Sequence, residues 1–149
     1  MRSQGLEYEV TLSPVDNLQI FASFAENDIR NVSEPVGDAI YLGAHPAFTS
    51  KTLGNLWARY TFVNTALKGL WLGAGFNYVG PANGNVVNPY LIYPRYTLYN
   101  SAAGYDWTWG GRKLSAVVNF DNMTNKFYQP ADQEVGLPRR VTGTLTLHF

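Results

Sequence analysis

The sequence lacks cysteine, contains few charged residues and has no long apolar run. The absence of cysteine excludes a disulfide framework and a thiolate metal site. Charged residues make up 15% of the 149 residues, against about 25% in ordinary soluble domains. The 11 basic and 11 acidic residues cancel, so the net charge gives no reason to expect nucleic acid as a partner. No segment approaches the roughly 18 consecutive apolar residues of a membrane-spanning helix, but membrane-spanning strands stay possible because their residues alternate.

Residues 139–149 read RRVTGTLTLHF and alternate between apolar and polar side chains. Successive side chains of a strand point to opposite faces, so one face of this segment is apolar and the other is polar. In a soluble sheet the apolar face would cover a core, whereas in an outer-membrane barrel it would face lipid. The terminal Phe149 favours the barrel, although a single strand is consistent with both. The apolar face consists of Val141, Gly143, Leu145, Leu147 and Phe149.

Alternating segments of this kind recur along the chain and predict an all-β, antiparallel fold. Segments of about 9–11 residues, tilted by roughly 40°, span the apolar band of a transmembrane barrel, whereas soluble strands average nearer five or six residues. Aromatic residues gather near the segment ends, where the interfacial girdles of a barrel lie. The predicted strands are residues 4–12, 17–27, 53–62, 70–79, 96–105, 113–121 and 139–149.

Short and long connections alternate between the predicted strands. Transmembrane barrels show this alternation, with short periplasmic turns on one side and long extracellular loops on the other. The pair Gly110-Gly111 suits a primed hairpin turn, while Gly73 and Gly75 are expected to give clearance or bending within a strand. The short connections are 13–16, 63–69 and 106–112, and the long ones are 28–52, 80–95 and 122–138.

Five motifs occur in a fixed order over nearly the whole chain. They are RSQGLEYEV at 2–10, LKGLWLGAGFNYVG at 67–80, YTLYNSAAGYDW at 96–107, LSAVVNFDNMTNKFYQ at 114–129 and PRRVTGTLTLHF at 138–149. Together they resemble the C-terminal third of a TonB-dependent siderophore receptor. The resemblance implies that residues 1–149 supply about seven strands of a 22-stranded, plugged barrel. Nothing in them resembles the plug domain or the TonB-binding segment, and residues 1–20 do not form a signal peptide, so we expect a piece of a longer protein.

The resemblance implies a receptor of the bacterial outer membrane that is not an enzyme and carries no cofactor or metal. Its partners would be outer-membrane lipid, a ferric siderophore, TonB, and the barrel-assembly machinery, which would recognise Leu145, Leu147 and Phe149. Aromatic faces suit bulky siderophores, and arginine suits their anionic groups. Alternatively, the loop aromatics pack the loops together or lie at the lipopolysaccharide boundary. The candidate ligand-binding residues are Tyr41, His45, Phe48, Tyr90, Tyr93, Arg95, Phe127 and Tyr128.

A second group of polar residues is expected to face the lumen. In this group Glu7 and Glu9 could pair with Arg59 or Arg140, or form salt bridges to the plug; a general acid/base pair is the less favoured alternative. The two histidines lie far apart in sequence, which argues against a metal site. The proposed lumen residues are Glu7, Glu9, Arg59, Asn77, Asn119 and Arg140.

Two other classes of protein share parts of this pattern. A soluble all-β module that binds a small ligand, similar to a lipocalin, would place the apolar face inside and form a monomer in water. A small autonomous outer-membrane barrel, either an enzyme or a porin, would close from this chain alone with an even number of strands.

Overall fold

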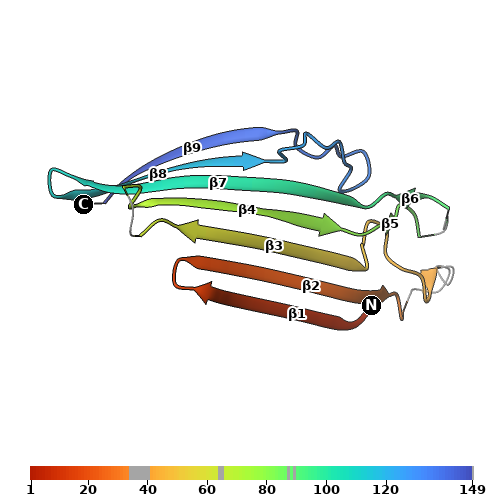
Figure 1. Ribbon diagram of the computed structural model, residues 1–149. Helices are drawn as coiled ribbons and strands as arrows, with labels where there is room; N and C mark the ends of the chain where they lie inside the picture. The colour runs from red at the N-terminus through yellow and green to blue at the C-terminus, as the bar shows by residue number, and fades with distance from the viewer. Residues whose placement is uncertain (34–40, 64–65, 87, 89, 149) are drawn as a thin grey trace.

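Seven long strands form one antiparallel sheet in the computed structural model, which describes residues 1–33, 41–63, 66–86, 88 and 90–148. The sheet order is β1-β2-β3-β4-β7-β8-β9, so each long strand lies beside its neighbours along the chain (Figure 1). The predicted all-β fold and all of its strands are confirmed. The strands are β1 (Arg2–Val15), β2 (Leu18–Arg30), β3 (Thr52–Thr61), β4 (Leu70–Val79), β7 (Tyr96–Trp109), β8 (Arg112–Asp121) and β9 (Arg140–His148).

The pairing of the strands brings the alternating apolar residues together on one face of the sheet. Leu56 on β3 lies opposite Ala22 on β2 and Phe76 on β4. At the other side of the sheet, Ala116 on β8 lies opposite Leu145 on β9. Since a slip of one residue would turn a strand over, this register confirms the predicted separation into an apolar and a polar face.

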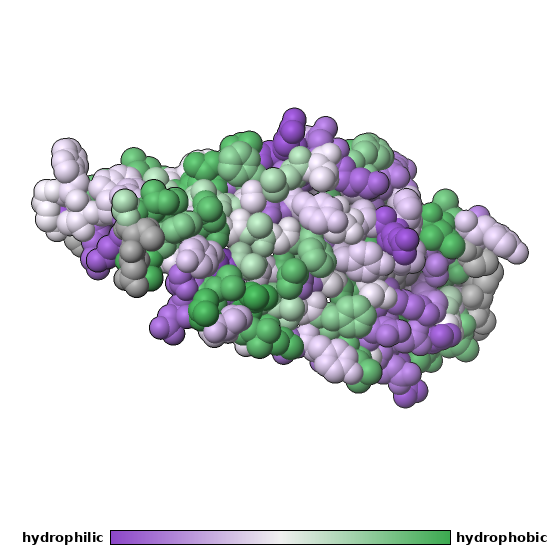
Figure 2. Space-filling model, viewed as in Figure 1, coloured by the Kyte–Doolittle hydropathy of each residue, from purple (hydrophilic) through white to green (hydrophobic). Residues whose placement is uncertain are grey.

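The apolar face of the sheet is exposed, and the buried residues of the long strands lie on the polar face. Leu6 and Leu145, on the apolar face, are 61% and 70% exposed, and Figure 2 shows hydrophobic side chains on the surface over the middle of the sheet. Ala102, which is 7% exposed, belongs to the polar face, opposite Gly73 and Asn119. A soluble domain buries its apolar face against a second layer, and no second layer covers this sheet within the described ranges.

Two short connections differ from their predicted limits. Strand β1 continues through Val15, with a register shift between Leu12 and Val15, so the first turn lies at Asp16 and Asn17 rather than at residues 13–16. Strand β7 continues to Trp109, which leaves Gly110 and Gly111 as the turn. Both glycines have positive φ angles, of 58° and 78°, as the predicted primed turn requires.

The connection from β4 to β7 contains a small hairpin that the sequence did not predict. Its strands are β5 (Ala82–Asn83) and β6 (Ile92–Tyr93), which pair with each other and form a separate two-stranded sheet. Strands of two residues carry too little alternation to be recognised by periodicity. No helix of the described residues is long and apolar enough to cross a membrane.

Asn122 holds the connection between β8 and β9 at its base. The side chain is 3% exposed, and its Nδ2 donates to the carbonyl groups of Lys126 at 2.9 Å and Leu137 at 3.0 Å. Its Oδ1 accepts a hydrogen bond from the Lys126 backbone N–H at 2.8 Å. The φ angle of Asn122 is 48°, a left-handed conformation that asparagine tolerates better than most residues.

We expect Asn122→Ala to open the connection between β8 and β9 without unfolding the sheet. The substitution leaves partly buried backbone groups of Lys126 and Leu137 without their partner, at a cost of about 2–4 kcal/mol in local stability. Limited proteolysis of the folded protein would show faster cleavage within residues 122–138. The exposed Thr124→Ala is the control, and equal cleavage rates in the two variants would contradict the role of Asn122.

Candidate functional site

Three long connections leave the same end of the sheet and join one another there (Figure 1). The first is tied to the second by backbone contacts: the Phe48 N–H donates to the Asn83 carbonyl at 2.7 Å, and Ser50 forms a β-bridge with Ala82. At the base of the same region, the Gly80 N–H donates to the Thr52 carbonyl at 2.8 Å. This end is therefore a packed assembly of loops.

Aromatic side chains complete the packing between the loops. The ring of Phe48 meets that of Tyr93 edge-on at 5.4 Å between centroids, and Tyr96 lies against Tyr128 at 4.6 Å. The Tyr93 hydroxyl donates to Asp132 Oδ1 at 3.1 Å, which links the second loop to the third. Burial raises the pKa of Tyr93, and the hydrogen bond to Asp132 raises it further, so the phenol stays protonated and remains a donor at neutral pH.

The space between these aromatic residues is small. A cavity lined by residues that include Phe48, Tyr93, Tyr96 and Gln129 has a volume of about 20 Å³, comparable to the space that one water molecule needs. Three of the predicted ligand-binding residues, Phe48, Tyr93 and Tyr128, therefore pack against other aromatic rings of the loop end. Packing between the loops was the alternative role predicted for these side chains.

His45 connects the first long connection to the end of β2. Its Nδ1 lies 2.9 Å from the Ile29 carbonyl oxygen and 3.4 Å from Asp28 Oδ1. The same carboxylate contacts Arg30 Nε at 2.8 Å and Lys51 Nζ at 3.5 Å. These contacts fasten the first long connection to the end of β2.

The remaining predicted ligand-binding residues are the accessible ones. Tyr90 is 92% exposed and Phe127 is 70% exposed, and Arg95 is exposed as well. Tyr41 is partly exposed, and its carbonyl accepts a hydrogen bond from the Ala44 N–H at 3.1 Å. The loop end thus combines a packed aromatic base with exposed groups that are free to meet a ligand.

The proposed lumen residues lie on the same face of the sheet. The suggested pairs of Glu7 or Glu9 with Arg59 or Arg140 are wrong, whereas their salt bridges to the plug stay a prediction. Arg140 Nη2 contacts Asp121 Oδ2 at 2.9 Å, and the Arg59 guanidinium lies 4.3 Å from the centroid of the Trp71 ring. Neither arginine pairs with Glu7 or Glu9, because these carboxylates lie on β1, which β2 separates from β3, and because β3, β4, β7 and β8 lie between β2 and β9. Asn77 accepts a hydrogen bond from Asn55 at 2.7 Å.

Three glycines on this polar face accommodate tryptophan rings. A Cβ atom added to Gly104 would overlap the Trp71 indole, and one added to Gly73 or Gly75 would overlap or crowd that of Trp57. Gly73 and Gly104 are buried as a result. Sequence reasoning treated these glycines as clearance or bending and did not identify the tryptophans, because a single sequence does not reveal which residues lie opposite each other.

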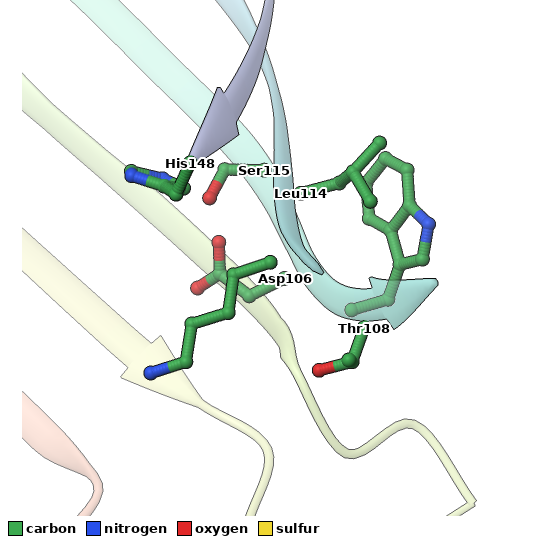
Figure 3. A pocket seen from close by; sticks show the side chains of 7 residues that line it. Asp106, Thr108, Leu114, Ser115 and His148 are labelled. Atoms are coloured by element: carbon green, nitrogen blue, oxygen red, sulfur yellow. The ribbon is translucent and has the colours of Figure 1, made fainter. Parts of the chain in front are cut away.

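A groove that the sequence did not predict lies at the turn end, where the hairpin of β7 and β8 extends beyond β4. Its volume is about 540 Å³, and Figure 3 shows Asp106, Thr108, Ser115 and His148 on one side of the hairpin, with Leu114 on the other. Lys113 lies opposite both Thr108 and His148 in the register. In the sequence, the polar Asp106 and Thr108 alternate with Trp107 and Trp109, and this alternation could have predicted that β7 continues to Trp109.

Two of the three residues expected to guide barrel assembly, Leu145 and Leu147, lie on the edge strand β9. Leu145 and Leu147 are exposed on the apolar face of β9. Phe149 lies outside the described residues.

The comparisons with known proteins agree with this geometry. The sequence matches the family described as TonB dependent receptor-like, beta-barrel over residues 1–123. It is 27% identical to the Ferrioxamine B receptor of Salmonella typhimurium, over 100% of this chain and 22% of the relative. It is 28% identical to the Ferrichrome outer membrane transporter/phage receptor of Escherichia coli K12, over 100% of this chain and 20% of the relative.

Solved structures share this fold. BauA, the ferric preacinetobactin receptor of Acinetobacter baumannii, superposes with a TM-score of 0.80 at 23% identity, over 97% of this chain and 21% of that chain. The chain thus spans about a fifth of the length of these two relatives and of BauA. By its sequence match and its open antiparallel sheet, the chain belongs to the TonB-dependent receptors and forms part of their β-barrel.

Proposed function

We propose that this chain is the C-terminal part of the barrel wall of an outer-membrane receptor that takes up ferric siderophores with energy from TonB. The observation that carries the proposal is which face of the sheet is covered: the apolar face is exposed, and the buried residues of the long strands lie on the polar face. Hydrocarbon is the medium that suits such an exposed face. The names of two relatives, a ferrioxamine B receptor and a ferrichrome transporter, supply the class of ligand.

In this proposal the two ends of the sheet have different roles. The loop end faces the outside of the cell and offers Tyr90, Phe127 and Arg95 to the ferric siderophore, while the packed loop aromatics hold that surface in place. The turn end faces the periplasm. The apolar face contacts outer-membrane lipid, and the polar face, which carries Glu7, Glu9, Arg59, Asn77, Asn119 and Arg140, lines the lumen.

The chain performs no chemistry of its own in this role. It contributes wall and binding surface, and TonB acts on other parts of the complete receptor. The barrel-assembly machinery recognises the C-terminal strand through Leu145, Leu147 and Phe149. In these roles the chain needs no cofactor, because the iron is already bound by its chelator when it reaches the receptor.

Uptake by the complete receptor tests the proposal. Cells in which this receptor is the only siderophore receptor are given radioactive iron as ferrioxamine B, ferrichrome or preacinetobactin, with and without TonB. We expect TonB-dependent uptake of at least one of these chelates. Failure of all three, in cells where the folded receptor is present in the outer membrane, would contradict the assigned class of ligand.

Tyr90→Ala and Phe127→Ala should each weaken binding of the transported chelate by about tenfold, since an aromatic contact contributes on the order of 1 kcal/mol beyond its buried area. The matched control is Trp109→Ala, which removes an exposed aromatic residue at the turn end. Binding titrations with the purified receptor measure all three. Equal affinities for the three variants and the unsubstituted receptor would show that the ligand does not contact these loops.

A further inference from the structure

The hairpin of β7 and β8 extends beyond its neighbour β4 at the turn end of the sheet (Figure 1). Strand β4 has 10 residues and β7 has 14. The two strands are level at the loop end, where Val79 lies opposite Tyr96, the first residue of β7. At the turn end Leu70, the first residue of β4, lies opposite Tyr105. All of the extra length of β7 therefore lies at the turn end.

The extra length brings the tip of the hairpin to the depth of lipid headgroups. With a rise of about 3.3 Å per residue and a tilt of about 40°, β4 spans roughly 25 Å along the membrane normal, which is the height of the lipid-facing band of a barrel. By the same reasoning β7 spans roughly 35 Å. The tip therefore lies about 10 Å beyond this band, where the polar headgroups of a bilayer lie.

One side of the hairpin is aromatic and continues the apolar face of the sheet. Tyr105 lies on the apolar face opposite Leu70, and alternation along the strand places Trp107 and Trp109 on the same side. The rings of Tyr105 and Trp107 stack at 5.7 Å between centroids with 20° between their planes, and Trp109 is 76% exposed. An indole has an apolar body and an N–H donor, so it suits the boundary between acyl chains and headgroups.

The same side of the hairpin carries a single charge, and this charge is positive. Arg112 lies directly opposite Trp109, and directly opposite residues of an antiparallel pair share a face. The other charged residues of the hairpin, Asp106 and Lys113, belong to the polar face, and Figure 3 shows Asp106 on the side away from Leu114. A guanidinium binds phosphate through paired hydrogen bonds, and basic residues at a membrane surface attract anionic lipids.

Two features thus favour a lipid over a folded protein as the occupant of this surface. The first is continuity, since the aromatic side of the hairpin extends the face that contacts hydrocarbon in the proposed function. The second is charge complementarity between Arg112 and a phosphate at headgroup depth. The polar side chains of the groove at the turn end lie on the other side of the hairpin, so a ligand bound to them would not compete for this surface.

We propose that Trp107, Trp109 and Arg112 form a binding site for the headgroup of an anionic phospholipid in the leaflet that faces the periplasm. Arg112 binds the phosphate, and the two indoles lie between the headgroup and the first part of the acyl chains. The inference rests on the proposed function, because the apolar face must contact a bilayer. The site fixes the depth at which the hairpin lies in the membrane.

Photolabelling of the complete receptor from the lipid side tests the proposal. The receptor is reconstituted into vesicles of phosphatidylethanolamine and phosphatidylglycerol, with a trace of phosphatidylglycerol that carries a photoreactive diazirine in its headgroup. After irradiation, the receptor is digested with a protease that does not cut at lysine or arginine, and the labelled peptides are identified by mass spectrometry. We expect a labelled peptide within residues 105–116.

Arg112→Gln should lower the labelling of this peptide by about tenfold, which is the effect of losing one charge-assisted contact. Trp109→Ala should lower it as well, and Arg112→Lys should retain part of it. The matched control is Lys113→Gln, which removes the same charge from the next residue of β8 but on the polar face, and should leave the labelling unchanged. Retention of heat-modifiable mobility shows that the variant barrels are folded.

Three outcomes would overturn the proposal. The first is equal labelling in Arg112→Gln and Lys113→Gln. The second is loss of the label when inorganic phosphate is added, which would indicate a site for free phosphate. The third is a protein adduct instead of a lipid adduct when a benzophenone amino acid replaces Leu114, the partner of Trp107, in cells. The radioactive-iron experiment distinguishes these failures from failure of the proposed function, because a receptor that imports no siderophore can still be labelled at the hairpin, and one that imports a siderophore can lack the label.

Discussion

Leu145→Arg is expected to lower the free energy of unfolding of the complete receptor in lipid by about 2–4 kcal/mol, the cost of an arginine on the lipid face near the middle of the bilayer. Leu145 lies opposite Ala116, within the central part of β9, and 70% of it is exposed on the apolar face. Ala74→Arg, at the middle of β4 and exposed on the same face, should have a similar effect. Equilibrium unfolding from lipid vesicles measures both.

The neighbouring residue provides the control. Thr144 precedes Leu145 and lies on the polar face opposite Val117, so Thr144→Arg should change the free energy of unfolding far less. The comparison keeps the introduced residue and its depth in the membrane nearly constant and changes only the face. Equal costs at positions 144 and 145 would contradict the assignment of the apolar face to lipid.

Gly104→Val is expected to destabilise the complete receptor by about 1–3 kcal/mol, the usual cost of forcing extra atoms into a packed site. A Cβ atom at this position overlaps the Trp71 indole, so the ring has to move, and the guanidinium of Arg59 loses its stacking surface. Thermal unfolding of the purified receptor measures the cost. The effect should become much smaller in a Trp71→Ala background, where the obstructing ring is absent.

The matched control is Gly143, which lies on the apolar face opposite Val118. A Cβ atom added there has no other atom within 4 Å, so Gly143→Val should be nearly neutral. If Gly104→Val destabilised the receptor equally with and without Trp71, the cost would come from the backbone, and the close contact between ring and glycine would not explain it.

The period-two pattern was sufficient to predict the strands and their faces. Tyr8 and Phe24, assigned to one face from their own strands alone, are direct partners in the sheet. The limits of β7 were less predictable, because Gly110-Gly111 drew the whole segment 106–112 into the predicted turn although the turn needs only the two glycines. The hairpin of β5 and β6 gave no usable signal, since it depends on contacts with Phe48 and Ser50 in another loop.

The candidate site was predictable by residue type but not by role. The loop aromatics were recognised, yet nothing in the sequence distinguishes the packed Phe48 and Tyr93 from the exposed Tyr90 and Phe127, because burial depends on how three loops meet. Arg59 was assigned to the correct face and given the wrong partner. The choice between Glu7 and Trp71 as its neighbour is made by strand order and register, which one alternating pattern leaves undetermined.

Because the long strands pair in their order along the chain, the long loops can change in evolution without changing the pairing of the sheet. Among the described residues, every two long strands that pair with each other also follow one another along the chain. The register of each pair is therefore set locally and does not depend on the length of a distant connection. An insertion or exchange in one long loop leaves every other hairpin in place, and the entropic cost of a longer loop rises only slowly. Receptors built in this way can acquire new surface specificities by loop grafting while the same barrel segment is kept, and this chain is a suitable recipient for such chimeras.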